Sequence, residues 1–471
     1  EDAESHARGD GIRNQKENDR IEIAFHAFCI TKGTFHMAEM LFTFASYATR
    51  MEGSLTPLKG MKRLADTLHP YGIKITWLVN HDSAEVLTNE LSEWHDRFGD
   101  DVAVMVPHFK GGAPELVAQA RATRQRMQKI LPWTRADIAA NHVRNRESLE
   151  SLEAAGFIGL WGFCWEQIEV DDITDRGCPW GFYYLDPAFR TAPNTRPKGL
   201  IGMEWTARDL LKSFHSGNPC LYSTDPNDVG RGGLCSWEDI AYWERMAENY
   251  ARNTRYNDHV FLLQHQEAHE MERTLCQCYT DEDIREASVM LDRFAAYLKG
   301  RASMMTLPEA AALYRERYNH TASSYMLWED TPTKPYNPDY AWSTPVGPWP
   351  KTFLYYDRGA QMMFIEGKVE PVCIRNYARP YVYGEFFAEP DIPRTRLAHD
   401  TRFGWNRDIE ILVNSNRSMP YGLALWKDYS LYQIAEAPGL VEGKILPREL
   451  LFLRYELQAG ENRFHVKLQG K

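Results

Sequence analysis

The chain has 471 residues, of which 44% are hydrophobic and 25% are charged, and its formal net charge at pH 7 is −11. This length allows two domains, one of them large, and the composition is that of a globular protein. The acidic balance argues against a protein that binds nucleic acid, and the sequence contains no run of about twenty apolar residues that could span a membrane.

The N-terminal region predicts an arm followed by the first strand and helix. Residues 1–20 are polar and charged, and we expect them to form a loosely held arm. The apolar run Ile21–Cys29 predicts a strand. Apolar residues from Thr34 to Tyr47 then recur at helical spacing, which predicts a helix.

A unit made of a buried strand, a polar turn and an amphipathic helix recurs after residue 70. Predicted strands are Ile73–Val79, Val102–Val106, Ile138–Ala140, Phe157–Cys164, Leu200–Glu204 and Val260–His265. Predicted helices cover 87–98, 114–130, 149–155, 237–253 and 282–298, and a short one begins at Pro308. Long loops at 167–199 and 213–234 interrupt the pattern, and loops of this length are usually functional.

The C-terminal third has a different character. Residues 331–351 are rich in Pro, Tyr and Trp, which predicts a linker after a barrel domain at 21–330. Alternating segments such as Ile409–Val413 and Leu451–Tyr455 predict a β-sandwich accessory domain at 352–471. Binding carbohydrate and bracing the barrel are both open roles for it, and bracing is favoured.

Four segments together resemble the polysaccharide deacetylase (NodB-homology) family and related glycoside hydrolase/deacetylase barrels. They are Ile75–Val79, Asn145–Phe157, Phe261–His265 and Met305–Ala310, and the resemblance spans Ile21 to Tyr318. It implies an α/β fold, a (β/α)7-type barrel with about seven parallel strands and an active site at their carboxyl ends. It also implies a carbohydrate substrate.

Two motifs of that family differ here. The resemblance implies paired aspartates at the end of the first strand, where this sequence reads Phe25-His26-Ala27-Phe28. It also implies a two-histidine motif after the third strand, where only His108 stands. Either a metal site is rebuilt from other strand ends, or the barrel carries out another carbohydrate reaction.

Residues at predicted strand ends offer such a site. We predict that a divalent metal, with zinc as the leading candidate, is held by His26, Asp82, His108 and His142. Each histidine has the alternative of a hydrogen-bonded residue at the rim. Asp82 could instead open a capping box with Ser83-Ala84-Glu85.

The predicted catalytic residues are carboxylates and one histidine. Glu166 could serve glycoside hydrolysis with a second carboxylate, and His265 with Glu267 could transfer protons. Salt-bridged or solvated glutamates are the alternative. Predicted substrate-binding residues are Trp165, Trp180, Glu204 and Trp205. The loop 225–233 lacks the Lys-Ser/Thr pair of a phosphate loop and is interpreted as lying beside the substrate.

The sequence therefore predicts a carbohydrate-active hydrolase that removes acyl groups from an oligo- or polysaccharide with the help of a metal. A metal-independent glycosidase and a non-catalytic sugar-binding protein are the alternatives. We expect no nucleic-acid partner and no membrane span. We also expect an extracytoplasmic location, periplasmic or secreted, although the sequence shows no signal peptide.

Overall fold

The computed structural model describes most of the chain beyond residue 38. The described residues are 39–49, 56–140, 146–163, 182–185, 194, 196–204, 206–207, 225–273, 279–322, 324–328, 352–357, 362–365, 368–371, 398–399, 407–415, 418–426, 429–446 and 450–471.

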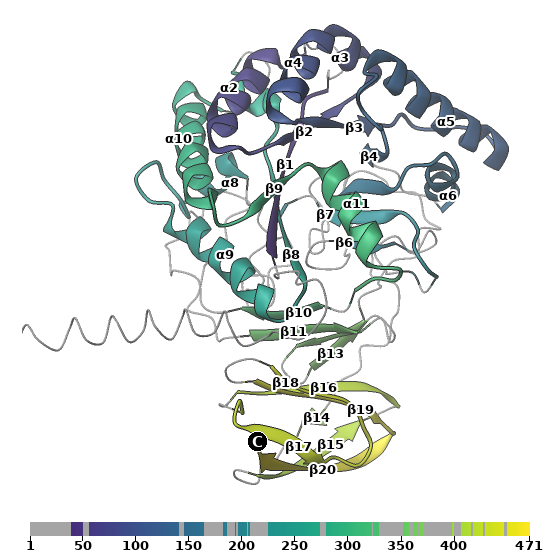
Figure 1. Ribbon diagram of the computed structural model, residues 1–471, viewed down its shortest axis with the longest axis vertical. Helices are drawn as coiled ribbons and strands as arrows, with labels where there is room; N and C mark the ends of the chain where they lie inside the picture. Colours follow the sequence, from purple (N-terminus) through teal and green to yellow (C-terminus); the bar gives the residue numbers. More distant parts are fainter. Residues whose placement is uncertain are drawn as a thin grey trace, which may run out of the picture. The chain divides into compact units, whose positions relative to one another are not determined.

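A curled sheet of mostly parallel strands forms the first part of the described structure (Figure 1). The strand order is β6-β7-β5-β4-β3-β2-β1-β8, and β9 pairs with β1. Among these strands β6 alone runs antiparallel, to β7. The strands are β1 (Glu39–Tyr47), β2 (Ile75–Val79), β3 (Asp101–Met105), β4 (Ile138–Ala140), β5 (Gly159–Phe163), β6 (Phe182–Tyr184), β7 (Ile201–Glu204), β8 (His259–His265) and β9 (Ser303–Met305).

This sheet curls but does not close into a barrel, because β6 and β8 remain at its two edges. The Ala207 N–H, just after β7, donates a hydrogen bond of 2.7 Å to the Leu263 carbonyl of β8. The predicted parallel α/β architecture is confirmed as a half-barrel, and a closed (β/α)7 barrel is not observed.

Helices follow most of the parallel strands. They are α2 (Leu58–Leu68), α3 (His81–Val86), α4 (Thr88–Phe98), α5 (Ala113–Ile130), α6 (Arg146–Ala154), α8 (Pro226–Arg231), α9 (Ala241–Arg252), α10 (Asp281–Leu298) and α11 (Leu307–Arg317). Short 3₁₀ turns are η1 (His69–Tyr71), η2 (Asn253–Arg255) and η3 (Ala268–Met271). Within the described part of the chain, no helix combines the length and the apolar character needed to cross a membrane.

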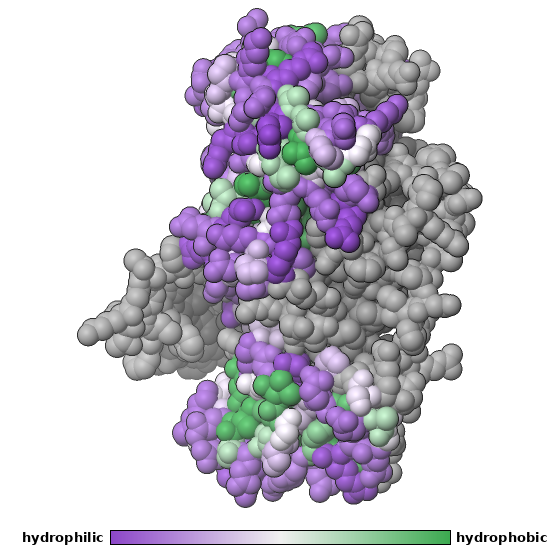
Figure 2. Space-filling model, turned by 90° about the vertical axis from the view of Figure 1, so that its right-hand side faces the viewer, coloured by the Kyte–Doolittle hydropathy of each residue, from purple (hydrophilic) through white to green (hydrophobic). Residues whose placement is uncertain are grey.

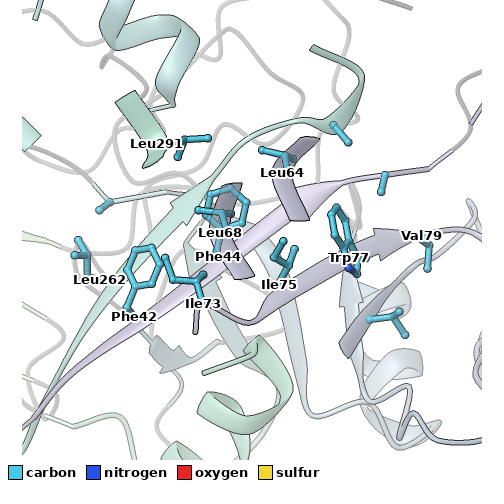
Figure 3. Close-up of a cluster of buried hydrophobic side chains, with 14 of the residues drawn as sticks. Phe42, Phe44, Leu64, Leu68, Ile73, Ile75, Trp77, Val79, Leu262 and Leu291 are labelled. Carbon is cyan, nitrogen blue, oxygen red and sulfur yellow. The ribbon is translucent and has the colours of Figure 1, made fainter. Parts of the chain in front are cut away.

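Both faces of the sheet are buried, which explains why its strands are apolar at nearly every position. One face packs against α2 and α10 in a cluster that Figure 3 shows: Phe42, Phe44, Leu64, Leu68, Ile73, Ile75, Trp77, Val79, Leu262 and Leu291. The opposite face packs against α11. Its cluster includes Leu41, Leu78, Phe261, Leu263, Leu307, Ala310 and Tyr314.

The first strand of the sheet differs from the prediction. The helix expected from Thr34 to Tyr47 is wrong, because residues Glu39–Tyr47 form β1, which pairs with β2 and β8. In a strand buried on both faces, apolar residues also occur at helical spacing, and the two patterns cannot be told apart by periodicity alone. The strand expected at Ile21–Cys29 lies outside the described residues.

Two local predictions also need correction. The loop predicted at 167–199 contains β6, which forms an antiparallel pair with β7. The N-cap of α3 is Asn80, whose side chain accepts a hydrogen bond from Ser83 N–H, so Asp82 does not open a capping box. Asp82 lies in the first turn of α3 and is exposed.

The C-terminal region consists of antiparallel sheets. One contains β10 (Ser324–Trp328), β11 (Thr352–Asp357), β12 (Met362–Ile365) and β13 (Lys368–Pro371). A second contains β14 (Ala398–His399), β15 (Asp408–Ser415), β17 (Tyr432–Glu436) and β20 (Gly460–Gly470). A third contains β16 (Met419–Trp426), β18 (Leu440–Leu446) and β19 (Leu450–Leu457).

Strand β10 lies within the residues predicted for the barrel domain and pairs with β11, which lies within the predicted accessory domain. The domain boundary stays a prediction. The predicted linker at 331–351 lies outside the described residues. Arrangement of the sheets as a sandwich stays a prediction.

The surface is mainly hydrophilic over the helices in the view of Figure 2, and hydrophobic residues gather over the C-terminal sheets. Among the described residues, the large hydrophobic side chains with high exposure are Val86, Trp237, Leu431 and Val441. Single exposed side chains of this kind are normal and mark no binding surface.

Candidate metal centre and buried histidine

The carboxyl ends of the parallel strands bring polar residues to one edge of the sheet. His265 is the last residue of β8 and pairs in register with Ala45 of β1. Glu204 is the last residue of β7, and Asn80 directly follows β2. Active sites of parallel α/β proteins lie at this edge, because loops from several strands converge there.

His265 forms a buried pair with Asp225, which directly precedes α8. His265 Nδ1 and Asp225 Oδ2 lie 3.0 Å apart, and the two side chains are 1% and 5% exposed. The Trp161 ring of β5 lies 5.2 Å from the histidine ring, centroid to centroid. A carboxylate at Nδ1 fixes the orientation of the ring and favours a proton on that nitrogen.

A second group of chemically active side chains lies immediately beyond His265. Glu267, His269 and Glu270 place one ligand atom each within 4.8 Å of one another. Glu267 Oε2 and His269 Nε2 are 2.9 Å apart. All three side chains are half-buried, so they are partly shielded from solvent but still accessible to it.

Two neighbours hold Glu270 in this group. The Gln266 side-chain amide donates to Glu270 Oε2 at 2.8 Å, and the Tyr279 hydroxyl donates to Glu270 Oε1 at 3.1 Å. The Gln266 side chain is fully buried, and within the described residues its Oε1 has no hydrogen-bond partner. A buried carbonyl oxygen beside the carboxylate is suited to bind an ordered water or an ion.

Helix α2 fixes the loop that carries these residues. The Glu272 carboxylate accepts hydrogen bonds from the N–H groups of Lys59 and Gly60, at 3.1 and 3.2 Å. These two N–H groups belong to the first turn of α2 and have no partner within the helix. A Cβ on Gly60 would overlap the backbone carbonyl of Ala268 in η3, so the close approach requires glycine.

Replacing Gly60 with alanine is therefore expected to displace η3. Because backbone atoms must move, the cost in unfolding free energy should be about 1–3 kcal/mol, and metal affinity should fall with it. Gly230→Ala in α8 is the matched control, since a Cβ there would make only ordinary contact with Met290, at 3.7 Å. Thermal melts and metal titration of both variants test this, and equal behaviour would contradict the close contact.

The electrostatic environment favours an ionised Glu267. Burial raises the pKa of Glu267, but the hydrogen bond from His269 and the charges of His269 and His265 lower it by more. The pKa therefore lies below its ordinary value. A carboxylate that is already ionised is available as a metal ligand without losing a proton first, whereas His269 would have to release a proton when it binds an ion.

The donor set fits a divalent ion. One imidazole nitrogen and two carboxylates are the ligand types that zinc, manganese and iron accept in proteins. Three protein ligands also leave coordination positions for water and substrate, as catalytic sites require. Zinc as the identity of the metal stays a prediction.

The metal ligands predicted from the sequence are only partly described. His26 and His142 lie outside the described residues. Asp82 and His108 are both exposed, and within the described part of the chain neither belongs to a group of three potential ligands. The predicted set of four ligands stays a prediction, and the described residues offer a different group.

The structure also describes only some of the other predicted site residues. His265 and Glu267 lie at the described site, although their hydrogen-bond partners are Asp225 and His269 rather than each other. Glu204 is 2% exposed and lies at the carboxyl end of β7. The remaining predicted residues lie outside the described part of the chain, so their roles stay predictions: Glu166, Trp165, Trp180 and Trp205.

Sequence reasoning did not identify three residues of this site, namely Asp225, His269 and Glu270. The run Glu267-Ala268-His269-Glu270 follows directly after a predicted strand. Three potential ligands within four residues at a strand end are a sequence pattern that indicates a metal site. Asp225 gave no such signal, because it lies forty residues before His265 in the chain.

Comparison with known proteins adds one distant similarity. No protein-family model matches the chain, and no curated protein matches it. Among solved structures, the chain aligns with a crystal structure described as a "putative polysaccharide deacetylase" from Mycobacterium smegmatis. Identity is 10%, the alignment covers 62% of this chain and 96% of that chain, and the TM-score is 0.36. A similarity at this level gives no basis for assigning an activity to this chain.

Proposed function

We propose that the chain is a metal-dependent hydrolase that removes an acyl group from a carbohydrate. The observation that carries the proposal is the group Glu267, His269 and Glu270 at the carboxyl end of β8, next to the buried His265–Asp225 pair. The carbohydrate substrate is supported by the resemblance of the strand and helix segments to polysaccharide deacetylases.

The proposed roles follow from the geometry. Glu267, His269 and Glu270 would hold the ion. When bound, a divalent ion supplies a polarised acyl carbonyl and a water of lowered pKa. In the overall reaction, the oxygen of water forms a bond to the acyl carbon, the bond from that carbon to the sugar oxygen or nitrogen breaks, and the sugar heteroatom gains a proton.

His265 and Asp225 are assigned a positioning role. The His265 side chain is 1% exposed, so direct contact with a substrate would require the site to open. His265 contributes to lowering the pKa of Glu267, and residues behind metal ligands commonly tune affinity and activity in this way.

The experiment combines metal analysis with two product assays. The purified chain is expected to contain a divalent metal and to release acetate from acetylated glycans. Chelation should abolish release, and added zinc or manganese should restore it, without new reducing ends. Release of reducing ends that resists chelation would instead establish the glycosidase alternative. Binding of glycans without either product would establish a non-catalytic protein.

A further inference from the structure

A cavity of about 530 Å³ lies at the amino end of β8, away from the proposed metal centre. It is lined by the start of β8, by α11, by β10 and β11, and by β18 and β19 of the C-terminal sheets. The six steps from His259 to His265 rise about 3.3 Å each, so the two ends of β8 are about 20 Å apart. The cavity is therefore separate from the metal centre.

Tyrosines dominate the lining. Five of them contribute to it: Tyr256, Tyr314, Tyr318, Tyr325 and Tyr355. The rings of Tyr325 and Tyr355 stack with centroids 4.6 Å apart and an interplanar angle of 15°. Tyrosine combines an apolar ring with a polar hydroxyl, and such a surface suits ligands that alternate C–H faces with hydroxyl groups.

A hydrogen-bonded network fixes these tyrosines. Glu442 Oε1 accepts from the Tyr325 hydroxyl at 2.7 Å, and Oε2 accepts from the Tyr355 hydroxyl at 2.6 Å. Lys444 Nζ lies 2.7 Å from Glu442 Oε1, also donates to the Tyr325 hydroxyl, and sits 4.2 Å from the Tyr325 ring centroid. The lining is therefore held in place before any ligand arrives, which reduces the entropic cost of binding.

The network leaves hydrogen-bonding capacity toward the cavity. An ammonium group has three N–H donors, of which Glu442 and Tyr325 account for two at Lys444.

The charges of the lining balance. Asp258 and Glu442 contribute negative charge, and Lys444 and Arg454 contribute positive charge. An anion or a cation would meet attraction and repulsion together, whereas a neutral polyol can use both donors and acceptors. The volume also falls in the range of roughly 300–1,000 Å³ that is typical of small-molecule sites.

We propose that this cavity binds a neutral saccharide, about a disaccharide in size, at a site separate from the metal centre. The proposal does not require the metal centre to be catalytic, because the cavity and its lining are independent of it. In this proposal, residues of the C-terminal sheets bind the ligand in addition to packing in the core.

Isothermal titration of the full chain with neutral oligosaccharides tests the proposal. Cellotetraose and the tetramer of N-acetylglucosamine are the neutral probes, and sulfate and a sulfated oligosaccharide are the anionic ones. Lys444→Met should weaken neutral binding at least about 10-fold, since one tenfold step corresponds to roughly one hydrogen bond to a charged group. Tyr355→Phe, which removes only a hydroxyl, should weaken it to a smaller degree.

Lys467→Met is the matched control, because Lys467 is exposed on β20 and does not line the cavity. Lys444→Met should retain the metal content of the unaltered chain, because Lys444 lines only the cavity, and this separates the site from the metal centre. If Lys444→Met and Tyr355→Phe both fail to fold, Asp258→Asn alters an exposed lining residue instead. Absence of neutral binding, binding unaffected by these changes, or preference for the anionic probes would overturn the proposal.

Discussion

His269→Ala is expected to abolish stoichiometric metal binding and, with it, the release of acyl groups. His269 supplies the only nitrogen ligand of the group, and its Nε2 lies 2.9 Å from the Glu267 carboxylate. Loss of a residue behind a metal ligand already costs roughly 10–100-fold in affinity or activity, so loss of a ligand itself should exceed about 100-fold. Metal analysis after dialysis and acetate release measure the effect.

Glu270→Gln is the conservative companion to this variant. It keeps the shape of the side chain and the hydrogen bond that Tyr279 donates to Oε1, and its new amide can donate to Gln266 Oε1 once the Gln266 amide flips, but it removes the negative charge. The amide group should therefore preserve folding and lose metal affinity. A change in melting temperature without a change in bound metal would assign Glu270 to stability alone.

The control is His108, one of the two predicted ligands that are exposed. His108 lies on the loop after β3, at the same edge of the sheet, and within the described residues it belongs to no group of three potential ligands. His108→Ala should therefore retain full metal content. If His108→Ala loses the metal and His269→Ala keeps it, the group at the end of β8 is the wrong site and the set predicted from the sequence gains support.

Much of the parallel sheet could be predicted because local signals agreed with the tertiary fold. Strands β2, β3 and β8 are five to seven residues long and mostly apolar, as expected when helices cover both faces. Helix α4 ends at Gly99, where φ is +80°, a conformation that glycine adopts without strain. Pro114 lies in the first turn of α5, where a missing N–H costs nothing.

The wrongly predicted helix at β1 and the missed residue Asp225 have a common physical origin. In Glu39–Tyr47, residues 41, 44 and 47 fit a helix, but only pairing with β2 and β8 decides that the segment is a strand. Likewise, the partner of His265 is set by where α8 begins, and the loop that delivers Asp225 has no pattern of its own. The sequence pattern identifies the strand that carries a functional side chain. The partner of that side chain depends on the path of the connecting loops, which hydrophobic periodicity does not encode.

Asp225→Asn is expected to lower turnover about 10–100-fold while the protein remains folded. The substitution keeps the size of the side chain but removes the charge that faces His265 Nδ1 at 3.0 Å. The imidazole then loses its anionic partner and the orientation that the carboxylate imposes. Since neither residue contacts the substrate in the proposed arrangement, the fall should be in kcat, and KM should stay nearly constant.

A double substitution separates this positioning role from a purely structural one. If Asp225 acts through His265, the pair Asp225→Asn and His265→Gln should be little worse than His265→Gln alone, because effects of coupled residues are not additive. Asp82→Asn is the matched control, since Asp82 is exposed at the same edge of the sheet, and its turnover should equal that of the unaltered chain. Additive losses, or loss of stability with unchanged kcat, would show that the buried pair supports the fold and not the reaction.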